Sequence, residues 1–302
     1  MPTSQPITVK NLTKRYSNFT ALDNVDFAVK RGEVFGYLGP NGAGKTTTIR
    51  IITGLSRPSK GSCQVFGQIP GVKKGIYNKI GVLFEEKNLY ERLTGLQNLK
   101  FYANLYNVKK KRIINLLDCF GLIGSEKKKV TTYSKGMKQR LLICRTLLHK
   151  PELLILDEPT DGLDPNSAGV IIEAIKEFVK EGKTVLISSH NMDEVDEICN
   201  RVAFLKDGKI IDINNPDILK QKYGQAVLRV KIKSKVRNKL LNIIDNNDNL
   251  TDCGSDIYIL DLYLAANPWS KLNKIKNMKE NQIINVHSRE ASLKEVFKEI
   301  TS

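Results

Sequence analysis

The sequence predicts an α/β protein with a parallel central sheet and a second, smaller α/β region at its C-terminal end. The apolar run Val34–Leu38 leads directly into a glycine-rich stretch, and the run Leu153–Leu156 ends in two carboxylates. Buried parallel strands are continuous apolar runs that carry functional groups at their carboxyl ends. Beyond Pro216, residues 226–233 (AVLRVKIK) alternate apolar and basic side chains, which indicates a half-buried strand.

Composition limits the class of protein. The chain has 302 residues, with 41% hydrophobic and 26% charged, which is typical of a globular protein with one large or two smaller domains. The net charge of +16 is compatible with a polyanionic partner or with a lysine-rich, solvated surface. The segment 216–302 holds 15 basic and 10 acidic residues, so the excess is spread along the chain, which favours the solvated surface.

The cysteines and the termini indicate the compartment. The cysteines are odd in number and never spaced C-x-x-C, so we expect free thiols in a reducing compartment and no zinc site. The start, MPTSQPITVK, has no apolar core, and no stretch approaches the length of a membrane span. We therefore expect neither a signal peptide nor a spanning helix, so that a membrane role would require a partner.

Residues 39–48 (GPNGAGKTTT) match the P-loop pattern, in which backbone N–H groups hold phosphates at the start of a helix. Gly42 permits a tight loop, Lys45 is expected to reach the β- and γ-phosphates, and the Thr46 hydroxyl to ligate Mg²⁺. The following helix is predicted over 46–55. The predicted ATP-contacting residues of this P-loop are Gly39, Pro40, Asn41, Gly42, Ala43, Gly44, Lys45, Thr46 and Thr47.

The stretch 153–159 (LLILDEP) supplies carboxylates for the same site. Taken alone, this stretch could be an acidic turn at the end of a strand. Beside a P-loop, a catalytic role for the two carboxylates is favoured. Asp157 suits Mg²⁺ coordination. Glu158 suits the polarisation of an attacking water, which requires a carboxylate close to the γ-phosphate.

The segment 131–165 resembles the nucleotide-binding subunit of an ABC transporter. Ser134 and Gly136 stand where that family has its signature motif, whereas Lys135 and Met137 depart from it. A serine and a glycine at a helix start can donate hydrogen bonds to an anion. The resemblance implies that both contact the γ-phosphate of ATP bound by a second subunit, and that Asp164 in the following D-loop contacts that subunit.

The resemblance implies roles for three more residues. Tyr16 matches the aromatic residue that stacks on adenine. Glu85 stands where the family has a glutamine that ligates Mg²⁺ or water, with Glu86 as the alternative if the alignment shifts by one. His190, after the apolar run 185–188, matches the histidine that senses the γ-phosphate, and we predict that it is catalytic together with Glu158.

The match implies an ABC-type ATP-binding cassette over residues 5–215. Short strands are expected around the P-loop over 5–80, including a small antiparallel β subdomain, with a helical subdomain over about 87–150 and the rest of the parallel core over 151–213. Residues 216–302 are predicted to form a small C-terminal α/β domain that resembles the tails of exporter-class subunits. Its last helix starts with Ser292 and Glu295 as a capping box.

The function implied is that of an ATPase subunit that powers a separate membrane permease, with export favoured over import. It would bind ATP and Mg²⁺, form a homodimer or a heterodimer with a paralogous subunit, and lie in the cytoplasm against the inner face of the membrane. The alternative is a soluble ABC-type ATPase acting on nucleic acid or the ribosome. The DNA-maintenance class has a long coiled coil between P-loop and signature, but only 89 positions separate Lys45 from Ser134, without heptads. Ribosome-acting members usually carry two cassettes, so no nucleic-acid partner is expected.

Overall fold

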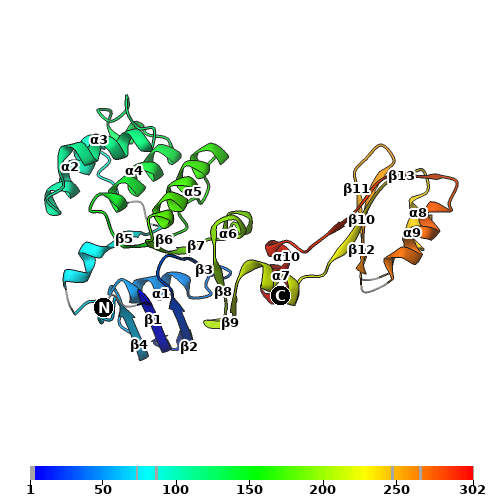
Figure 1. The fold of residues 1–302 in the computed structure, drawn as a ribbon, viewed down its shortest axis with the longest axis horizontal. Coiled ribbons are helices and arrows are strands. Elements are labelled where there is room, and N and C mark those ends of the chain that lie inside the picture. The colour runs from blue at the N-terminus through cyan, green and yellow to red at the C-terminus, as the bar shows by residue number, and fades with distance from the viewer. Residues whose placement is uncertain (1–3, 73, 86–87, 246–247, 265–266, 302) are drawn as a thin grey trace. The chain divides into compact units, whose positions relative to one another are not determined.

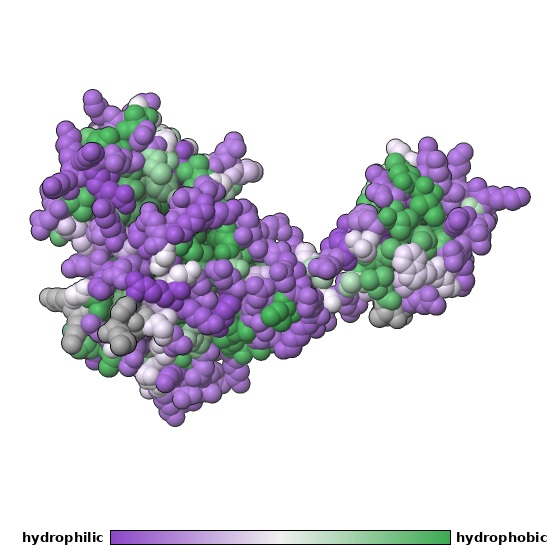
Figure 2. All heavy atoms as spheres, in the orientation of Figure 1, coloured by the Kyte–Doolittle hydropathy of each residue, from purple (hydrophilic) through white to green (hydrophobic). Residues whose placement is uncertain are grey.

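The computed structural model describes residues 4–72, 74–85, 88–245, 248–264 and 267–301. They form two compact units, the core unit up to Pro216 and the tail unit over 217–300. Each is described by itself. Polar and charged side chains cover most of the visible face of the core unit, with apolar patches between them (Figure 2). All five cysteines are free. Within the described ranges, no helix has the length and hydrophobicity needed to cross a membrane.

The core unit is built on a six-stranded sheet of order β5-β6-β7-β3-β8-β9. Neighbouring strands are parallel except β8 and β9, which are antiparallel. Every residue of β3, β6 and β7 is buried, so the predicted parallel strands are confirmed. The strands are β3 (Val34–Leu38), β5 (Ile80–Leu83), β6 (Leu153–Asp157), β7 (Thr184–Ser188), β8 (Arg201–Lys206) and β9 (Lys209–Asn214).

A second, antiparallel sheet of order β2-β1-β4 belongs to the same unit. Its strands are β1 (Ile7–Tyr16), β2 (Phe19–Val29) and β4 (Lys60–Val65). The first two have 10 and 11 residues, so the prediction of short strands is wrong here. Irregularities in their register let long strands bend around the core without ending. Phe27 of β2 stacks on Phe35 of β3 with ring centroids 5.5 Å apart, which joins the two sheets in one hydrophobic core.

Helices connect the strands of the central sheet and cover its faces. Figure 1 shows α2, α3 and α4 gathered on one side of the central sheet and β1, β2 and β4 on the other. Between residues 88 and 150 the helices are α2, α3 and α4. Helix α1 ends three residues earlier than predicted, because Gly54 adopts φ +75°. The helices are α1 (Lys45–Ile52), α2 (Gly95–Leu105), α3 (Lys110–Cys119), α4 (Lys135–Leu147), α5 (Pro165–Lys180) and α6 (Met192–Ile198), with 3-10 turns at Lys74–Lys79 and Val130–Thr132.

The tail unit contains a four-stranded antiparallel sheet of order β11-β12-β10-β13. In chain order its elements form a split β-α-β-β-α-β unit. Buried side chains from β10 and β12 pack with those of the two intervening helices in a separate core. The elements are α7 (Pro216–Tyr223), β10 (Val227–Ser234), α8 (Arg237–Leu241), β11 (Asn249–Asp252), β12 (Ile257–Tyr263), α9 (Pro268–Lys276), β13 (Asn281–Arg289) and α10 (Leu293–Thr301).

Besides the strand over 226–233 and the last helix, the stretches 256–264 (DIYILDLYL) and 283–288 (IINVHS) predict two more strands. The structure confirms all four elements as β10, α10, β12 and β13. The predicted capping box is also present: Ser292 N–H donates to Glu295 Oε2 at 2.8 Å, and Glu295 N–H donates to Ser292 Oγ at 3.3 Å. The sequence reasoning missed α7, β11, α8 and α9, because they are short or polar.

Candidate nucleotide site

The P-loop joins β3 to α1 and leaves the start of that helix open. Gly44 precedes α1 with φ +107°, and a Cβ there would lie 2.6 Å from the carbonyl oxygen of Ala21, so only glycine fits. No side chain caps α1, whereas α2 and α4 are capped by Thr94 and Ser134. The first amides of α1 therefore point at a position that an anion can occupy.

The side chains after Gly44 divide between this site and the core. Lys45 is 7% exposed, and its Nζ donates to the carbonyl oxygens of Gly39 at 2.7 Å and Pro40 at 3.2 Å. Thr48 is buried and contacts the Tyr37 hydroxyl at 3.1 Å. Burial raises the pKa of Tyr37, so that contact stays between two neutral groups. Only the first two of the three threonines therefore remain for a ligand.

The two residues predicted to hold Mg²⁺ lie side by side. Thr46 Oγ1 donates to Asp157 Oδ2 at 3.3 Å, and the other oxygen of Asp157 accepts a hydrogen bond from Ser188 Oγ. Asp157 is 1% exposed at the end of β6. A hydroxyl and a carboxylate oxygen from separate elements fit the oxygen ligands that Mg²⁺ takes, with water or phosphate completing the shell.

Glu158 is held in an unusual backbone conformation. Its φ of +49° lies in the left-handed region, which costs energy for any residue other than glycine. Hydrogen bonds from its N–H stabilise this conformation. The N–H donates to the carbonyl oxygen of Ser188 at 3.2 Å and to the Ser188 hydroxyl at 3.1 Å. The conformation turns Glu158 toward the P-loop, where Oε1 lies 4.0 Å from Lys45 Nζ.

The two residues predicted to be catalytic are in contact. His190 Nδ1 lies 2.8 Å from Glu158 Oε2, and its backbone N–H donates to the same oxygen at 3.2 Å. The far ring nitrogen, Nε2, lies 3.4 Å from Asp161 Oδ1. The imidazole thus stands between two carboxylates, one from the end of β6 and one from the D-loop (residues 161–164).

The signature segment (residues 133–137) contacts the D-loop region within the same chain. Ser134 Oγ accepts the Met137 N–H at 3.2 Å, so in this structure the hydroxyl caps α4. A Cβ on Gly136 would lie 2.4 Å from Ser167 Oγ, so this glycine is required by packing against α5. Asp164 caps α5, and the hydrogen bonds from Ser167 lower the pKa of its carboxyl.

The structure places Tyr16 and Glu85 farther out. Tyr16 ends β1 with 44% of its surface exposed, and Lys14 Nζ lies 4.7 Å from the centre of its ring. Glu85 is exposed just after β5, and the alternative, Glu86, lies outside the described residues. The Tyr16 ring is therefore accessible for stacking on a base. The surroundings of Glu85 do not indicate which group its carboxylate would bind.

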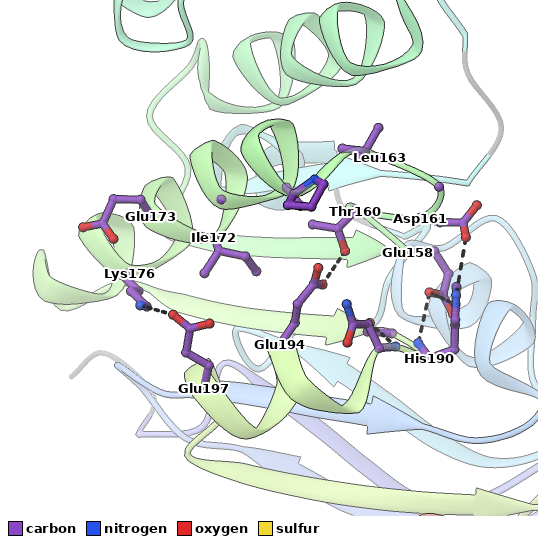
Figure 3. A pocket seen from close by; sticks show the side chains of 16 residues that line it. Glu158, Thr160, Asp161, Leu163, Ile172, Glu173, Lys176, His190, Glu194 and Glu197 are labelled. Carbon is purple, nitrogen blue, oxygen red and sulfur yellow. Dashed lines mark hydrogen bonds and ion pairs between the residues drawn. The ribbon is translucent and has the colours of Figure 1, made fainter. Parts of the chain in front are cut away.

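A hollow of about 570 Å³ extends from the Glu158–His190 pair between the D-loop, α5 and α6 (Figure 3). Figure 3 shows Glu158, His190 and Asp161 at one end and the ion pair of Lys176 with Glu197 at the other. The Thr160 hydroxyl, directly before the D-loop, donates to Glu194 of α6, the helix that follows His190. The lining is rich in carboxylates, so it favours a cationic or hydrogen-bond-donating neighbour over a nucleotide phosphate.

Two supporting residues were missed by the sequence reasoning. Ser188 holds both Asp157 and Glu158, and Gln139 of α4 donates to the carbonyl oxygen of Pro159 at 2.7 Å from a buried position. Ser188 ends the apolar run 185–188, but its contact with Asp157 joins residues 31 positions apart, so no local pattern indicated its role. Gln139 was a polar residue on the inward face of a helix, which has no distinctive pattern.

Comparison with known proteins places these observations in a family. A family profile described as ABC transporter matches residues 22–161. The chain is 37% identical over 301 residues to the fluoroquinolones export ATP-binding protein of Mycobacterium tuberculosis, covering 99% of this chain and 94% of that protein. It is 35% identical over 297 residues to the bacitracin transport ATP-binding protein of Bacillus licheniformis, covering 96% and 95%. A dimeric, post-hydrolysis ATP-binding cassette bound to ADP and Pi matches with a TM-score of 0.64 at 28% identity, covering 69% of this chain and 98% of that one.

Proposed function

The chain belongs to the family of ATP-binding subunits of ABC transporters, and from this premise we propose how its residues bind and hydrolyse ATP to drive a separate permease. One observation carries the proposal: the P-loop lysine, the buried carboxylate Asp157 and the Glu158–His190 pair meet at one edge of the central sheet. A site of this kind can hold a triphosphate, a metal ion and an attacking water within reach of one another.

We propose that the open amides of α1 and the Lys45 ammonium bind the β- and γ-phosphates, and that the exposed Tyr16 ring stacks on adenine. Thr46 and Asp157 would hold Mg²⁺, with Glu85 as a further ligand. Held there, the ion would supply positive charge that offsets the charge of the phosphates. Glu158 accepts a proton from the attacking water, and its contact with His190 fixes the carboxylate in place.

We infer that two chains associate head to tail, so that Ser134 and Gly136 of one chain face ATP on the other. The Ser134 hydroxyl now accepts an amide hydrogen bond, and its own proton is available to an anion. Asp164 would contact the second subunit beside this position. The second subunit is either another copy or a paralogous chain.

We propose that the chain serves an exporter whose permease docks near residues 85–97, placing it peripherally at the cytoplasmic face of the membrane. The names of the two relatives, which concern fluoroquinolone export and bacitracin transport, favour an antimicrobial or amphipathic cargo. The permease, rather than this chain, would choose the cargo.

The test is transport by inside-out vesicles that contain the chain together with the permease that copurifies with it. ATP should drive uptake of a fluorescent amphipathic drug, and Lys45→Ala in this chain should abolish uptake without dissociating the complex. ATPase activity that depends on added nucleic acid, in a chain that associates with no membrane protein, would contradict the proposal.

A further inference from the structure

Lys135, one of the two departures from the family signature, lies against the D-loop of its own chain. Its Nζ is 3.7 Å from Asp161 Oδ2. A Cβ built on Gly162 would lie 1.9 Å from that same nitrogen, so the ammonium group occupies the space beside the bare glycine backbone. Gly162 also has φ +60°. A side chain at position 162 would therefore both strain the backbone and displace Lys135.

Asp161, the partner of Lys135, also contacts His190, which in turn contacts the proposed catalytic carboxylate Glu158. Asp161 contacts Lys135 through Oδ2 and His190 Nε2 through Oδ1, at 3.7 and 3.4 Å. His190 in turn contacts Glu158 through its other ring nitrogen at 2.8 Å. The signature segment is thus connected to the catalytic carboxylate within one chain, through two side chains.

The charges in these contacts explain what Lys135 contributes. Glu158 and Asp161 face opposite nitrogens of one imidazole, so the positions of the two carboxylates together set the orientation of the ring. A positive charge on the far side of Asp161 offsets one of these carboxylates and draws it toward α4. Without Lys135, the Asp161 carboxylate would be left to His190 alone, and the imidazole would be pulled away from Glu158.

We propose that Lys135 is a positioning residue for ATP hydrolysis: it holds Asp161, and through Asp161 the orientation of His190 against Glu158. The inference rests on the proposed ATPase function of Glu158. It makes the signature segment an element that acts on the nucleotide site of its own chain, in addition to the contact that it is expected to make with ATP on a second subunit.

The exposure of the pair indicates which property should change on mutation. Both side chains of the Lys135–Asp161 pair are 48% exposed, and such pairs contribute little to the stability of a fold. Variants at these positions should therefore fold. Small errors in the orientation of catalytic groups reduce turnover strongly even when substrate binding is intact, so the effect belongs in kcat.

The experiment compares Lys135→Met with Lys138→Met in the purified chain. Lys138 lies on the same helix and pairs with Glu91 at 2.6 Å, so it is a matched lysine with an ion pair away from the D-loop. Lys135→Met should lower kcat by about threefold to tenfold, with KM for ATP changed less than about twofold. Lys135→Arg should restore most of the loss, and Lys138→Met should leave kcat unchanged. Equal kcat values for the two methionine variants would overturn the inference.

A second comparison tests whether Lys135 acts through Asp161. In an Asp161→Asn background, Lys135→Met should cause no further loss of kcat, because the charge that it offsets is already gone. A full additional loss would show that Lys135 acts elsewhere, for instance on the nucleotide itself, and would overturn the inference. Glu158→Gln separates the two proposals: if it hydrolyses ATP normally, the proposed function fails, whereas the inference alone fails if Glu158→Gln is inactive and Lys135→Met is normal.

Discussion

The core unit brings the charged groups of the nucleotide site together at one edge of a sheet, whereas the tail unit closes Arg229 and Asp261 into a pair of their own. Lys45, Asp157, Glu158 and His190 have several partners each, at distances from 2.5 to 4.0 Å. In the tail unit, Arg229 binds Asp261 through two hydrogen bonds of 2.6 Å. Charges with several imperfect partners are available for a ligand, and charges in closed bidentate pairs serve the fold.

The strongest test of this comparison is Glu158→Gln in the core unit. The amide keeps the shape of the side chain but cannot accept a proton, so turnover should fall by about a hundredfold or more while ATP still binds. Phosphate release and binding of a fluorescent ATP analogue measure the two effects. Thermal stability should be unchanged, and near-normal phosphate release would refute the assignment of the base.

The second prediction concerns shared sites. Ser134→Arg and Lys45→Ala chains should each be inactive alone. In an equal mixture, half of the dimers are mixed and one of their two sites is intact, so about a quarter of the wild-type activity should return. Crosslinking must first establish that mixed dimers form. If they form and activity stays at zero, the two halves of the site do not come from different chains.

Much of this site could be predicted from the sequence, because its residues stand next to one another in short motifs. The P-loop and the Asp157–Glu158 pair are local patterns with a direct chemical meaning. The supporting contacts could not be predicted, because they join residues far apart in the chain. The contacts of Ser188 and Gln139 exist only because the fold brings β6 next to β7 and α4 next to the segment after β6.

The same reasoning explains the tail unit. Alternation along β10, the apolar run of β12 and the capping box of α10 are local signals, and these elements were predicted. The pairing order of the strands depends on contacts between distant segments, and the short helix α8 has only five residues with little pattern. Sequence reasoning therefore identified elements of the tail unit but not its topology.

The third prediction tests the tail unit directly. Asp261→Asn removes the charge that holds Arg229, whose side chain is 31% exposed, so unfolding of the tail unit should become easier by about 1–3 kcal/mol. The ATPase rate of the folded protein should not change. Chemical denaturation and phosphate release measure the two properties. Lys239→Gln, which breaks the exposed pair with Glu280, serves as the control and should alter neither.

The fourth prediction concerns the pH dependence of stability in the tail unit. Hydrogen bonds from Arg289, and then from Ser292, lower the pKa of Glu295 from near 4.5 to about 2. A carboxyl with a lowered pKa in the folded state contributes stability above its unfolded pKa, and this is lost as pH falls toward the folded value. The difference in melting temperature between wild type and Glu295→Gln should therefore shrink as pH falls from about 5 to about 2. Glu290→Gln, at an exposed position, is the control, and a pH-independent difference would contradict the role of Glu295.

The smallest expected effect is that of Glu85→Gln. If Glu85 enters the nucleotide site, removing its charge relieves repulsion from the triphosphate, so the Mg²⁺ concentration needed for ATP binding should fall by about twofold. A magnesium titration of ATP affinity measures this in the purified chain. An unchanged titration together with impaired transport would instead assign Glu85 to the permease contact.

The pairing of β10 with β13 has a consequence for how this protein can change over evolution. Val227, at the start of β10, is paired with Arg289, at the end of β13, so the chain enters and leaves the four-stranded sheet at adjacent points. Segments that begin and end at neighbouring points tolerate changes in length better than other segments, because the flanking chain keeps its spacing. Residues 227–289 have this geometry. A family that must serve many different permeases can diversify such a segment without disturbing the machinery that hydrolyses ATP.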